Sequence, residues 1–450
     1  MKTTLTNGQI APIRSALKKA NTAFLKAYPG DPVRRQPVHT VYGGAQLFDA
    51  QTVQKMGEVA LRTMEEYAPS AATLAQALGL PTAHGFAEKV HARVVAKLRR
   101  EAVEDFRIDF EDGYGNRPDA EEDGHAVFTA EEVAKGMAKG TLSPFIGIRI
   151  KQFSEELFPR SARTTDLFVT TLLQRSEGRL PENFFITLPK VTIPEQVEAL
   201  DALLSTLESR HKLKKGSLKV ELMVETPQSI IGCKGQLALP ELVAAGNGRV
   251  VAAHFGTYDY TASCNITAAF QTMDHPACDF AKHVMQVSLA GSGVMLSDGA
   301  TNVMPVGPHK APKGGTLTEA QRAENREVVH RAWRLSYRHI RHSLEGAFYQ
   351  GWDLHPAQLP VRYATLYAFF LEGAEAASAR LKNFVEKAAQ ATLVGDVFDD
   401  AATGQGLLNY FLRGIACGAI TEAEAGATGL SLEEIRGRSF LKILEARRNR

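Results

Sequence analysis

Eight short apolar runs recur along this chain of 450 residues, each followed by a polar or Gly/Pro break and a longer stretch with helical periodicity. Such alternation is typical of a parallel α/β fold, and eight strands are the number that closes a (β/α)8 barrel. The runs are Val38–Tyr42, Phe106–Phe110, Phe145–Ile150, Phe184–Leu188, Val220–Val224, Val250–Phe255, Val294–Leu296 and Trp352–Leu354. We therefore predict an α/β fold of the (β/α)8 TIM-barrel type.

The stretches between the runs have helix signatures. One apolar face recurs at three- and four-residue steps, formed by Val53, Met56, Ala60, Met64 and Tyr67, which predicts an amphipathic helix. Three pairs fit a capping box at a helix start, in which two side chains bond two otherwise unpaired amides. These pairs are Thr129 with Glu132, Thr192 with Glu195, and Thr318 with Gln321.

The pattern divides the chain into three parts. We predict an N-terminal helical extension over residues 1–36, the barrel over 37–360, and a C-terminal helical domain over 361–450. Within the last part, helices are expected over Val361–Gln390, about Thr403–Cys417, and Ser431–Arg447, the last opened by Ser431 with Glu434 as a capping box.

Composition excludes several classes of protein. The formal net charge is +2, so no bulk field favours nucleic acid or an anionic membrane as partner. The N-terminus lacks the apolar core of a signal peptide, and no apolar run is long enough to span a bilayer. The four cysteines form no CxxC pair, which fits a reducing compartment. The sequence predicts a cytoplasmic protein.

Charged side chains follow nearly every apolar run. In chain order they are Asp109, Glu111 and Asp112, then Arg149 and Lys151, Lys190, Glu225, Asp259, Asp298 and His355, with Tyr42–Gly44 after the first run. Active sites of this barrel lie at the carboxyl ends of the strands. Because each charge brought there costs desolvation, so many of them favour a catalytic site over a structural role.

Glu225 and Asp259 follow the fifth and sixth runs, with no Cys or His beside them. Two carboxylates on neighbouring strands suit a hard cation such as Mg²⁺, with Mn²⁺ as the alternative. The competing interpretation is that each carboxylate caps the next helix or pairs with a lysine of the barrel.

Arg149 ends the third run in the sequence FIGIRIK. An inward arginine there is suited to a bidentate grip on a carboxylate or enolate, although an ion pair with Glu111 or Asp112 would serve structure instead. Three carboxylates within four residues, Asp109, Glu111 and Asp112, require cations nearby. Arg107, Arg149, Lys190 or the metal are candidates, and the carboxylates themselves favour an orienting role.

The segment GWDLHPAQLP carries Asp353, His355 and Gln358. A lone His-Pro pair is compatible with a catalytic base, but a structural histidine is the commoner case. The loop Pro305–Gly315 follows the seventh run, where barrels often bind phosphate; a surface loop is the alternative. A stripe on the next helix fits a solvated face or an anionic tail such as coenzyme A, and consists of Arg326, His330, Arg334 and Arg338.

Taken in order, six segments resemble the citrate lyase beta-subunit-like family, which includes citryl-CoA and malyl-CoA lyases and is related to metal-dependent 2-keto-acid aldolases. The segments are RIDFEDGYG, IGIRIK, LPKV, VELMVETPQSI, HFGTYDYTAS and GWDLHPAQ. The resemblance covers about Pro37 to Pro360. Lys151 stands where these lyases usually carry Asn.

The resemblance implies a barrel of the phosphoenolpyruvate/pyruvate type that acts as a Mg²⁺-dependent carbon–carbon lyase or aldolase. It implies metal at Glu225 and Asp259, a substrate carboxylate at Arg149, and a supporting carboxylate at Glu111. Lys190, Asp112 and Gln358 complete the expected substrate contacts, and homo-oligomers are expected by analogy. The substrate would be a 2-oxo acid or a hydroxyacyl compound, with coenzyme A as a candidate carrier.

In the mechanism this implies, the metal polarises a substrate carbonyl and Arg149 stabilises a developing enolate. The candidate bases are Asp298, Asp353, His355 and a metal-bound water. Two alternatives remain open at this point. One is a phosphotransfer enzyme of the phosphoenolpyruvate/pyruvate class on the same barrel. The other is a non-catalytic, metal-binding regulatory barrel.

Overall fold

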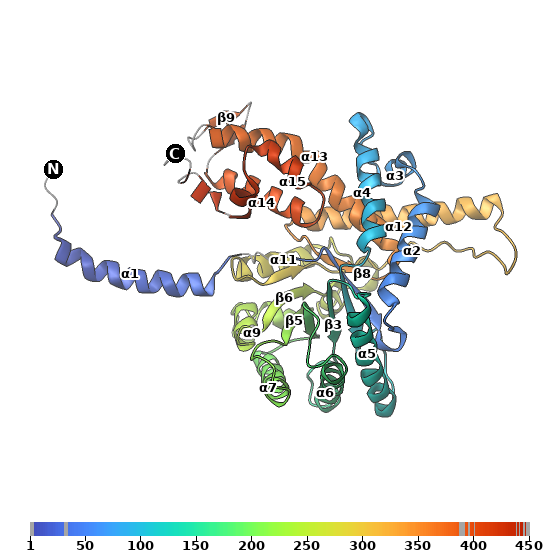
Figure 1. Cartoon of the computed structure of the whole chain (residues 1–450), viewed down its shortest axis with the longest axis horizontal. Coiled ribbons are helices and arrows are strands. Elements are labelled where there is room, and N and C mark those ends of the chain that lie inside the picture. The colour runs from blue at the N-terminus through green and yellow to red at the C-terminus, as the bar shows by residue number, and fades with distance from the viewer. Residues whose placement is uncertain are drawn as a thin grey trace.

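The structure is a computed structural model that describes residues 4–30, 35–386, 392–394, 397–399, 401–437, 439–440, 442–443 and 446. Eight parallel strands form its centre, and helices surround them (Figure 1). The strands are β1 His39–Gly44, β2 Asp105–Asp109, β3 Phe145–Arg149, β4 Phe184–Leu188, β5 Lys219–Val224, β6 Val250–Phe255, β7 Met295–Ser297 and β8 Gly351–Asp353. All eight predicted strands are therefore confirmed, with ends shifted by at most one or two residues.

The strands pair in the order β7-β6-β5-β4-β3-β2-β1-β8. Two backbone hydrogen bonds join the ends of this order, from Asp298 N to Gln350 O at 2.8 Å and from Trp352 N to Gly299 O at 2.9 Å. The sheet therefore closes into a barrel, which confirms the predicted fold class.

Helices cover the outside of the barrel. Those of the barrel region are α2 Thr52–Tyr67, α3 Ala71–Leu78, α4 Phe86–Glu101, α5 Asp119–Lys139, α6 Phe158–Arg175, α7 Pro194–Arg210, α8 Pro227–Ile230, α9 Leu239–Ala245, α10 Thr257–Ser263, α11 Pro276–Leu289 and α12 Glu319–Glu345. Outward residues of the strands, such as Ile108, Ile148 and Ile186, pack with these helices in one core. No helix in the described ranges has the length and apolarity needed to cross a membrane.

The C-terminal block is helical, as predicted. It contains α13 Leu359–Glu386, α14 Ala401–Ala416, α15 Glu422–Ala425 and α16 Leu432–Arg436, with the short strands β9 Thr392–Val394 and β10 Val397–Asp399. Because α13 begins at Leu359 and packs against α4 and α12 of the barrel, the boundary at residue 360 falls in the first turn of one continuous helix. The division into separate domains stays a prediction, and residues 387–390 of the expected first helix lie outside the described residues.

The predicted helix starts are confirmed in part. Thr318 and Ser431 cap α12 and α16 as expected. The start at Thr129 is wrong, since Thr129 is buried inside α5 and bonds His125 O. The start at Thr192 is off by one residue, because the Gln196 side chain, rather than that of Glu195, bonds Thr192 N. One continuous last helix to Arg447 is not observed, because α16 ends at Arg436 and residues 437 and 439 are not helical. Residues 440, 442–443 and 446 are helical again, and the rest of the predicted range lies outside the described residues.

The N-terminal extension contains α1 (Asn7–Ala27), which projects away from the rest of the molecule (Figure 1). The segment after the C-terminal end of α1 joins the body beside β7, where Gly30 N donates to Gly291 O at 2.8 Å. Gly291 precedes β7, so α1 leaves the molecule near the amino ends of the strands. No residue of α1 is buried by any part of the chain that the structure describes.

His39 of β1 predicts an acid sensitivity of the fold. Burial lowers the pKa of His39 to about 3, and its Nε2 accepts a hydrogen bond from Glu104 N at 3.0 Å. The unfolded chain binds this proton near pH 6.5, so the free energy of unfolding should fall as the pH drops from 6.5 toward 3, by up to about 1.4 kcal/mol per unit.

Chemical denaturation between pH 4 and 7 measures this effect. The variant His39→Asn keeps an acceptor for Glu104 N but cannot titrate, so its stability should depend less steeply on pH than that of the natural chain. His283→Asn, which alters an exposed histidine of α11, is the control and should keep the natural slope. Equal slopes in all three proteins would contradict the assignment to His39.

Candidate active site

Charged side chains converge at the carboxyl ends of β2 to β6. Asp109 and Arg149 end β2 and β3, Lys190 and Glu225 follow β4 and β5, and Asp259 lies in the first turn of α10 after β6. We name as the strand-end cluster Asp109, Glu111, Asp112, Arg149, Lys190, Glu225 and Asp259. Hydrogen bonds and ion pairs join the members of this cluster, as expected where parallel strands end at one edge of a barrel.

Arg149 and Asp109 form the buried base of the cluster. Arg149 Nε donates to Asp109 Oδ1 at 2.7 Å and Nη2 donates to Oδ2 at 2.5 Å, a bidentate pair. The same carboxylate accepts from the amides of Glu111 at 3.0 Å and Gly113 at 2.7 Å. A Cβ at Gly113 would lie 2.5 Å from Asp109 Oδ2, so only glycine fits there. Asp109 therefore fixes both the arginine and the loop that carries Glu111 and Asp112.

The remaining guanidinium nitrogen of Arg149 faces the other carboxylates. Nη1 lies 3.2 Å from Glu111 Oε2 and 3.8 Å from Asp112 Oδ2. The guanidinium also stacks over the rings of Tyr42 at 4.9 Å and Trp352 at 5.9 Å. These acidic neighbours hold the pKa of Arg149 well above its ordinary value despite burial. The arginine is thus a fixed positive charge with one edge turned toward the loop carboxylates.

Lys190 connects the two sides of the cluster. Its Nζ pairs with Glu111, lies 3.0 Å from Asp112 Oδ2, and lies 3.8 Å from Asp259 Oδ2. Its backbone N donates to Glu225 Oε1 at 2.7 Å. The residue has φ +50°, in the left-handed region that non-glycine residues seldom adopt. Such strain is concentrated at functional sites, and here it turns both the amide and the ammonium toward carboxylates.

The carboxylate of Asp259 lies close enough to Glu225 to affect its pKa. Glu225 is only 1% exposed, and burial together with the Asp259 charge raises the pKa of Glu225 to about 7. A Cβ at Gly256 would lie 2.5 Å from Glu225 Oε2, so this glycine admits the carboxylate beside β6. A buried carboxylate with an acidic neighbour is short of positive charge, which a bound cation would supply.

The cluster offers carboxylate oxygens to the predicted metal. Across the described ranges, no group of three or more His, Cys, Asp or Glu side chains is placed to hold a metal ion. The protein ligands available here are therefore the two carboxylates of Glu225 and Asp259. Mg²⁺ is commonly held by one or two carboxylates, with water and substrate oxygens completing its shell, so these residues fit that ion.

Three further residues predicted for the site have other partners. Asp298 is fully buried on the outer side of β7, 3.0 Å from Lys282 Nζ of α11, and accepts from Ser343 Oγ at 2.6 Å. His355 caps the short helix Pro356–Gln358 through Ala357 N at 3.1 Å. Gln358 bonds the backbone of Leu354 and Thr301. No contact between these residues and the strand-end cluster is present in the described structure.

Asp353 and Lys151, which the sequence also singled out, pair with residues outside the strand-end cluster. Asp353, a candidate base, pairs with Arg362 at 3.0 Å. Lys151 points away from the cluster, pairing with Glu122 at 2.9 Å and donating to Phe110 O at 2.6 Å. Because Glu122 belongs to α5, the departure from the family pattern at Lys151 has a structural role.

The loop and the stripe near α12 are largely solvated. Pro305–Gly315 has no regular structure, and Lys310 and Lys313 are exposed. In the stripe, His330 is buried and its Nε2 lies 2.7 Å from Tyr67 O, while Arg334 pairs with Glu327 at 3.1 Å. The stripe is therefore interrupted by a residue that packs inward.

Sequence reasoning missed a second layer of charge beneath the cluster. Arg107 is fully buried inside the barrel, where it pairs with Asp105 and, at 2.7 Å, with Glu221. His254 Nε2 lies 3.0 Å from Glu221 Oε2, and Tyr42 Oη donates to Glu221 Oε1 at 3.3 Å. Tyr42 thereby links this layer to Arg149 above it. Period-two alternation of Asp105, Arg107 and Asp109 along β2 was the available signal.

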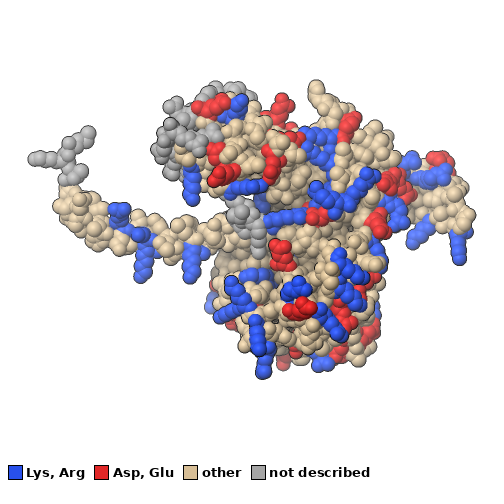
Figure 2. Space-filling view, in the orientation of Figure 1, with Lys and Arg blue, Asp and Glu red and all other residues tan. Residues whose placement is uncertain are grey.

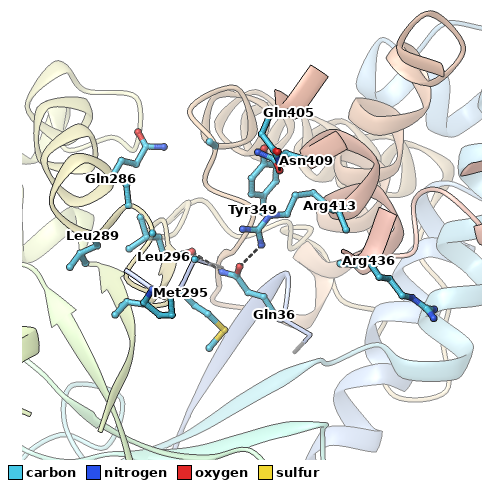
Figure 3. A pocket seen from close by; sticks show the side chains of 18 of the residues that line it. Gln36, Gln286, Leu289, Met295, Leu296, Tyr349, Gln405, Asn409, Arg413 and Arg436 are labelled. Atoms are coloured by element: carbon cyan, nitrogen blue, oxygen red, sulfur yellow. Dashed lines mark hydrogen bonds between the residues drawn. The ribbon is translucent and has the colours of Figure 1, made fainter. Parts of the chain in front are cut away.

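A separate cavity of about 680 Å³ lies between the barrel and the C-terminal helices (Figure 3). Arg413 of α14 crosses it, donating to Gln36 Oε1 at 2.8 Å and stacking on Tyr349 at 5.0 Å. Met295 and Leu296 of β7 form part of its wall. None of its lining residues belongs to the strand-end cluster.

Comparisons with known proteins agree with this architecture. The protein-family profile described as "Domain of unknown function (DUF6986)" matches residues 17–443. No curated protein matches. A crystal structure of a citrate lyase from Burkholderia xenovorans LB400 is similar, with a TM-score of 0.55 and 17% identity over 89% of this chain and 100% of that chain.

Two further solved structures are similar at a lower level. A malate synthase from Haloferax volcanii has a TM-score of 0.47 and 14% identity over 79% of this chain and 92% of that one. The CitE protein from Mycobacterium tuberculosis, in complex with magnesium, acetoacetate and coenzyme A, has a TM-score of 0.48 and 14% identity over 85% and 99%. The likeness to the citrate lyase confirms the barrel expected from the resemblance.

Proposed function

This chain belongs to the DUF6986 family, and we propose that it is a metal-dependent carbon–carbon lyase acting on a 2-oxo acid or a hydroxyacyl compound. The observation that carries the proposal is the strand-end cluster itself. A carboxylate pair, the buried Glu225 with the partly exposed Asp259, lies across Lys190 from the fixed arginine Arg149. The similar barrel from Burkholderia xenovorans LB400 bears the name citrate lyase, which supports the same class of reaction.

Glu225 and Asp259 would hold Mg²⁺, with Mn²⁺ as the alternative. When bound, such an ion supplies Lewis-acid polarisation of a substrate carbonyl. Arg149 would bind the substrate carboxylate through Nη1, the nitrogen that is not engaged by Asp109. Lys190 and Asp112 lie at the same opening and would orient the rest of the substrate.

In the cleavage direction, the substrate hydroxyl loses its proton, the carbon–carbon bond breaks, and its electron pair moves toward the carbonyl oxygen of the departing fragment. Arg149 and Lys190 stabilise the negative charge that develops, because both are held in place before the reaction. Glu111 contacts the side chains of both Arg149 and Lys190, and burial raises the pKa of Glu111. We assign to Glu111 the proton transfer at the reacting hydroxyl, since the side chains of Asp298, Asp353 and His355 have partners elsewhere.

A substrate screen tests the proposal. The full chain would be incubated, with Mg²⁺ and after chelation, with short hydroxyacids, with their coenzyme A thioesters, and with 2-oxo acids plus acyl donors. We expect Mg²⁺-dependent release or consumption of a 2-oxo acid with at least one substrate class. Turnover of phosphoenolpyruvate or ATP alone would overturn the proposal in favour of phosphotransfer. Absence of any turnover, with Mg²⁺ bound, would favour a regulatory barrel.

A further inference from the structure

The helix α1 presents an apolar face that nothing in the described structure covers. Ile10, Ile13, Leu17 and Phe24 are 42% to 67% exposed, and they follow the three- and four-residue spacing of a helix that packs along one seam. In proteins most of the stability of a helix comes from packing of its apolar face, and α1 buries no residue in the described structure. We therefore expect the apolar face of α1 to pack against a partner surface.

A second set of exposed apolar side chains surrounds the strand-end cluster. It lies in the segments that follow β1 and β3 to β7, and we call it the apolar rim. Its members are Leu47, Phe158, Ile193, Ile231, Leu237, Phe270, Val303 and Val306. Besides α1 with its flanking residues Leu5 and Tyr28, and the apolar rim, only Phe128, Phe280 and Val287 are large exposed apolar residues in the described ranges. Exposed apolar surface is thus concentrated at α1 and at the mouth of the candidate site.

These two surfaces also differ in charge. Residues 1–28 contain Lys and Arg but no Asp or Glu, and Figure 2 shows blue and no red side chains along α1. Beside the apolar rim, Glu155 and Glu156 are exposed, and the side chains of Asp112 and Asp259 are 58% and 42% exposed. The basic apolar helix therefore meets exposed carboxylates there, beside the exposed lysines Lys234, Lys310 and Lys313, whereas two α1 helices packed together would bring only positive charges together.

A chain cannot easily use its own α1 for this contact. The helix leaves the body beside Gly291, near the amino ends of the strands, while the apolar rim lies at their carboxyl ends. Figure 1 shows α1 directed away from the barrel. The partner that carries a matching rim is a second copy of the same chain.

We propose that α1 of one copy packs on the apolar rim of a second copy, so that the chains associate head to tail. The contact is heterologous, and such contacts form rings or open chains of subunits. Its apolar seam excludes water from the mouth of the neighbouring site, and Arg14, Lys18, Lys19 and Lys26 lie near the exposed carboxylates. The proposal concerns assembly and does not depend on the proposed reaction.

Sedimentation or light scattering of the full chain and two pairs of variants tests the proposal. Ile13→Asp/Leu17→Asp on the seam should reduce the assembly to single chains, whereas Ser15→Asp/Thr22→Asp, with the same charge change on the opposite face, should not. Phe270→Asp/Val306→Asp on the apolar rim should also yield single chains. Phe128→Asp/Val287→Asp, which changes the same residue types elsewhere, should leave the assembly intact.

Mixing separates this contact from other uses of α1. The seam variant keeps its rim and the rim variant keeps its α1, so an equimolar mixture should form two-chain complexes although each alone is single. Failure of the mixture to associate, an assembly unaffected by the rim variant, or a natural chain that is single would overturn the proposal. So would a single chain whose α1 binds phosphatidylserine vesicles, which would identify a membrane surface as the occupant.

Discussion

Glu225→Gln and Asp259→Asn should each weaken Mg²⁺ binding at least ~100-fold and reduce turnover by ~10³ or more, while the barrel stays folded. These carboxylates are the metal donors proposed for the site, and loss of even an indirect partner typically costs 10–100-fold in affinity. The amide substitutions preserve side-chain volume, and the amide oxygen introduced by Glu225→Gln could still accept from Lys190 N, as the carboxylate does. Isothermal titration with Mg²⁺ and circular dichroism measure the two quantities.

Glu155→Ala is the matched control, because it removes an exposed carboxylate near the same opening. It should leave Mg²⁺ affinity and turnover within about twofold of the natural chain, as surface substitutions usually do. If Glu225→Gln and Asp259→Asn both retained natural Mg²⁺ affinity, the proposed ligand pair would be refuted.

In the absence of metal, the same Glu225→Gln variant should be more stable than the natural protein. Burial and Asp259 raise the pKa of Glu225 from 4.5 to about 7, so the unfolded chain releases this proton first. The natural chain therefore loses stability as pH rises from 4.5 through 7, by on the order of 3 kcal/mol. At pH 8 the neutral side chain avoids that cost, and urea denaturation should show a higher midpoint. Mg²⁺ should stabilise the natural chain and not the variant.

The strand positions could be read from the sequence because parallel strands buried on both sides appear as apolar runs. The convergence of Arg149, Lys190 and Glu225 follows from the same fact, since the carboxyl ends of parallel strands share one edge. What the runs do not give is the direction of each side chain. Asp298 illustrates this limit, because it follows a strand of only three residues.

In β7, Met295 packs with the cluster of residues inside the barrel, and Asp298 is three positions later. Alternation therefore directs Asp298 outward, toward Lys282, but so short a strand gave no alternation to read beforehand. The layer around Arg107 was missed for a different reason. Its partner Asp105 lies on the same strand, but Glu221 lies on β5, apart from β2 in the barrel. The pairing of Arg107 with Glu221 depends on register, which the sequence alone did not provide.

Arg149→Lys should lower kcat/KM by about 10² to 10³ while the chain stays folded. A lysine keeps the charge but has no planar fork, so it cannot bond both oxygens of Asp109 and still present a donor to the opening. Removal of one fixed donor at a developing negative charge typically costs this much. Arg149→Met is the less informative variant, because a buried Asp109 without a partner would cost about 3–5 kcal/mol of stability.

Steady-state kinetics on the substrate found in the screen measures this effect, with Arg163→Lys as control. Arg163 makes a comparable pair with Asp123 at 2.7 Å, but on the exposed surface of α6, so its replacement should not change kcat/KM. A substrate analogue with an amide in place of the carboxylate distinguishes two roles of Arg149, namely binding of the substrate carboxylate and positioning of Asp109 and the loop after β2. The natural chain should reject the amide strongly, and Arg149→Lys should discriminate less, because the bidentate recognition has been lost. If Arg149→Lys kept both its rate and its discrimination, Arg149 would serve only to hold Asp109 and the loop after β2, and the substrate carboxylate would have to bind at Lys190 instead.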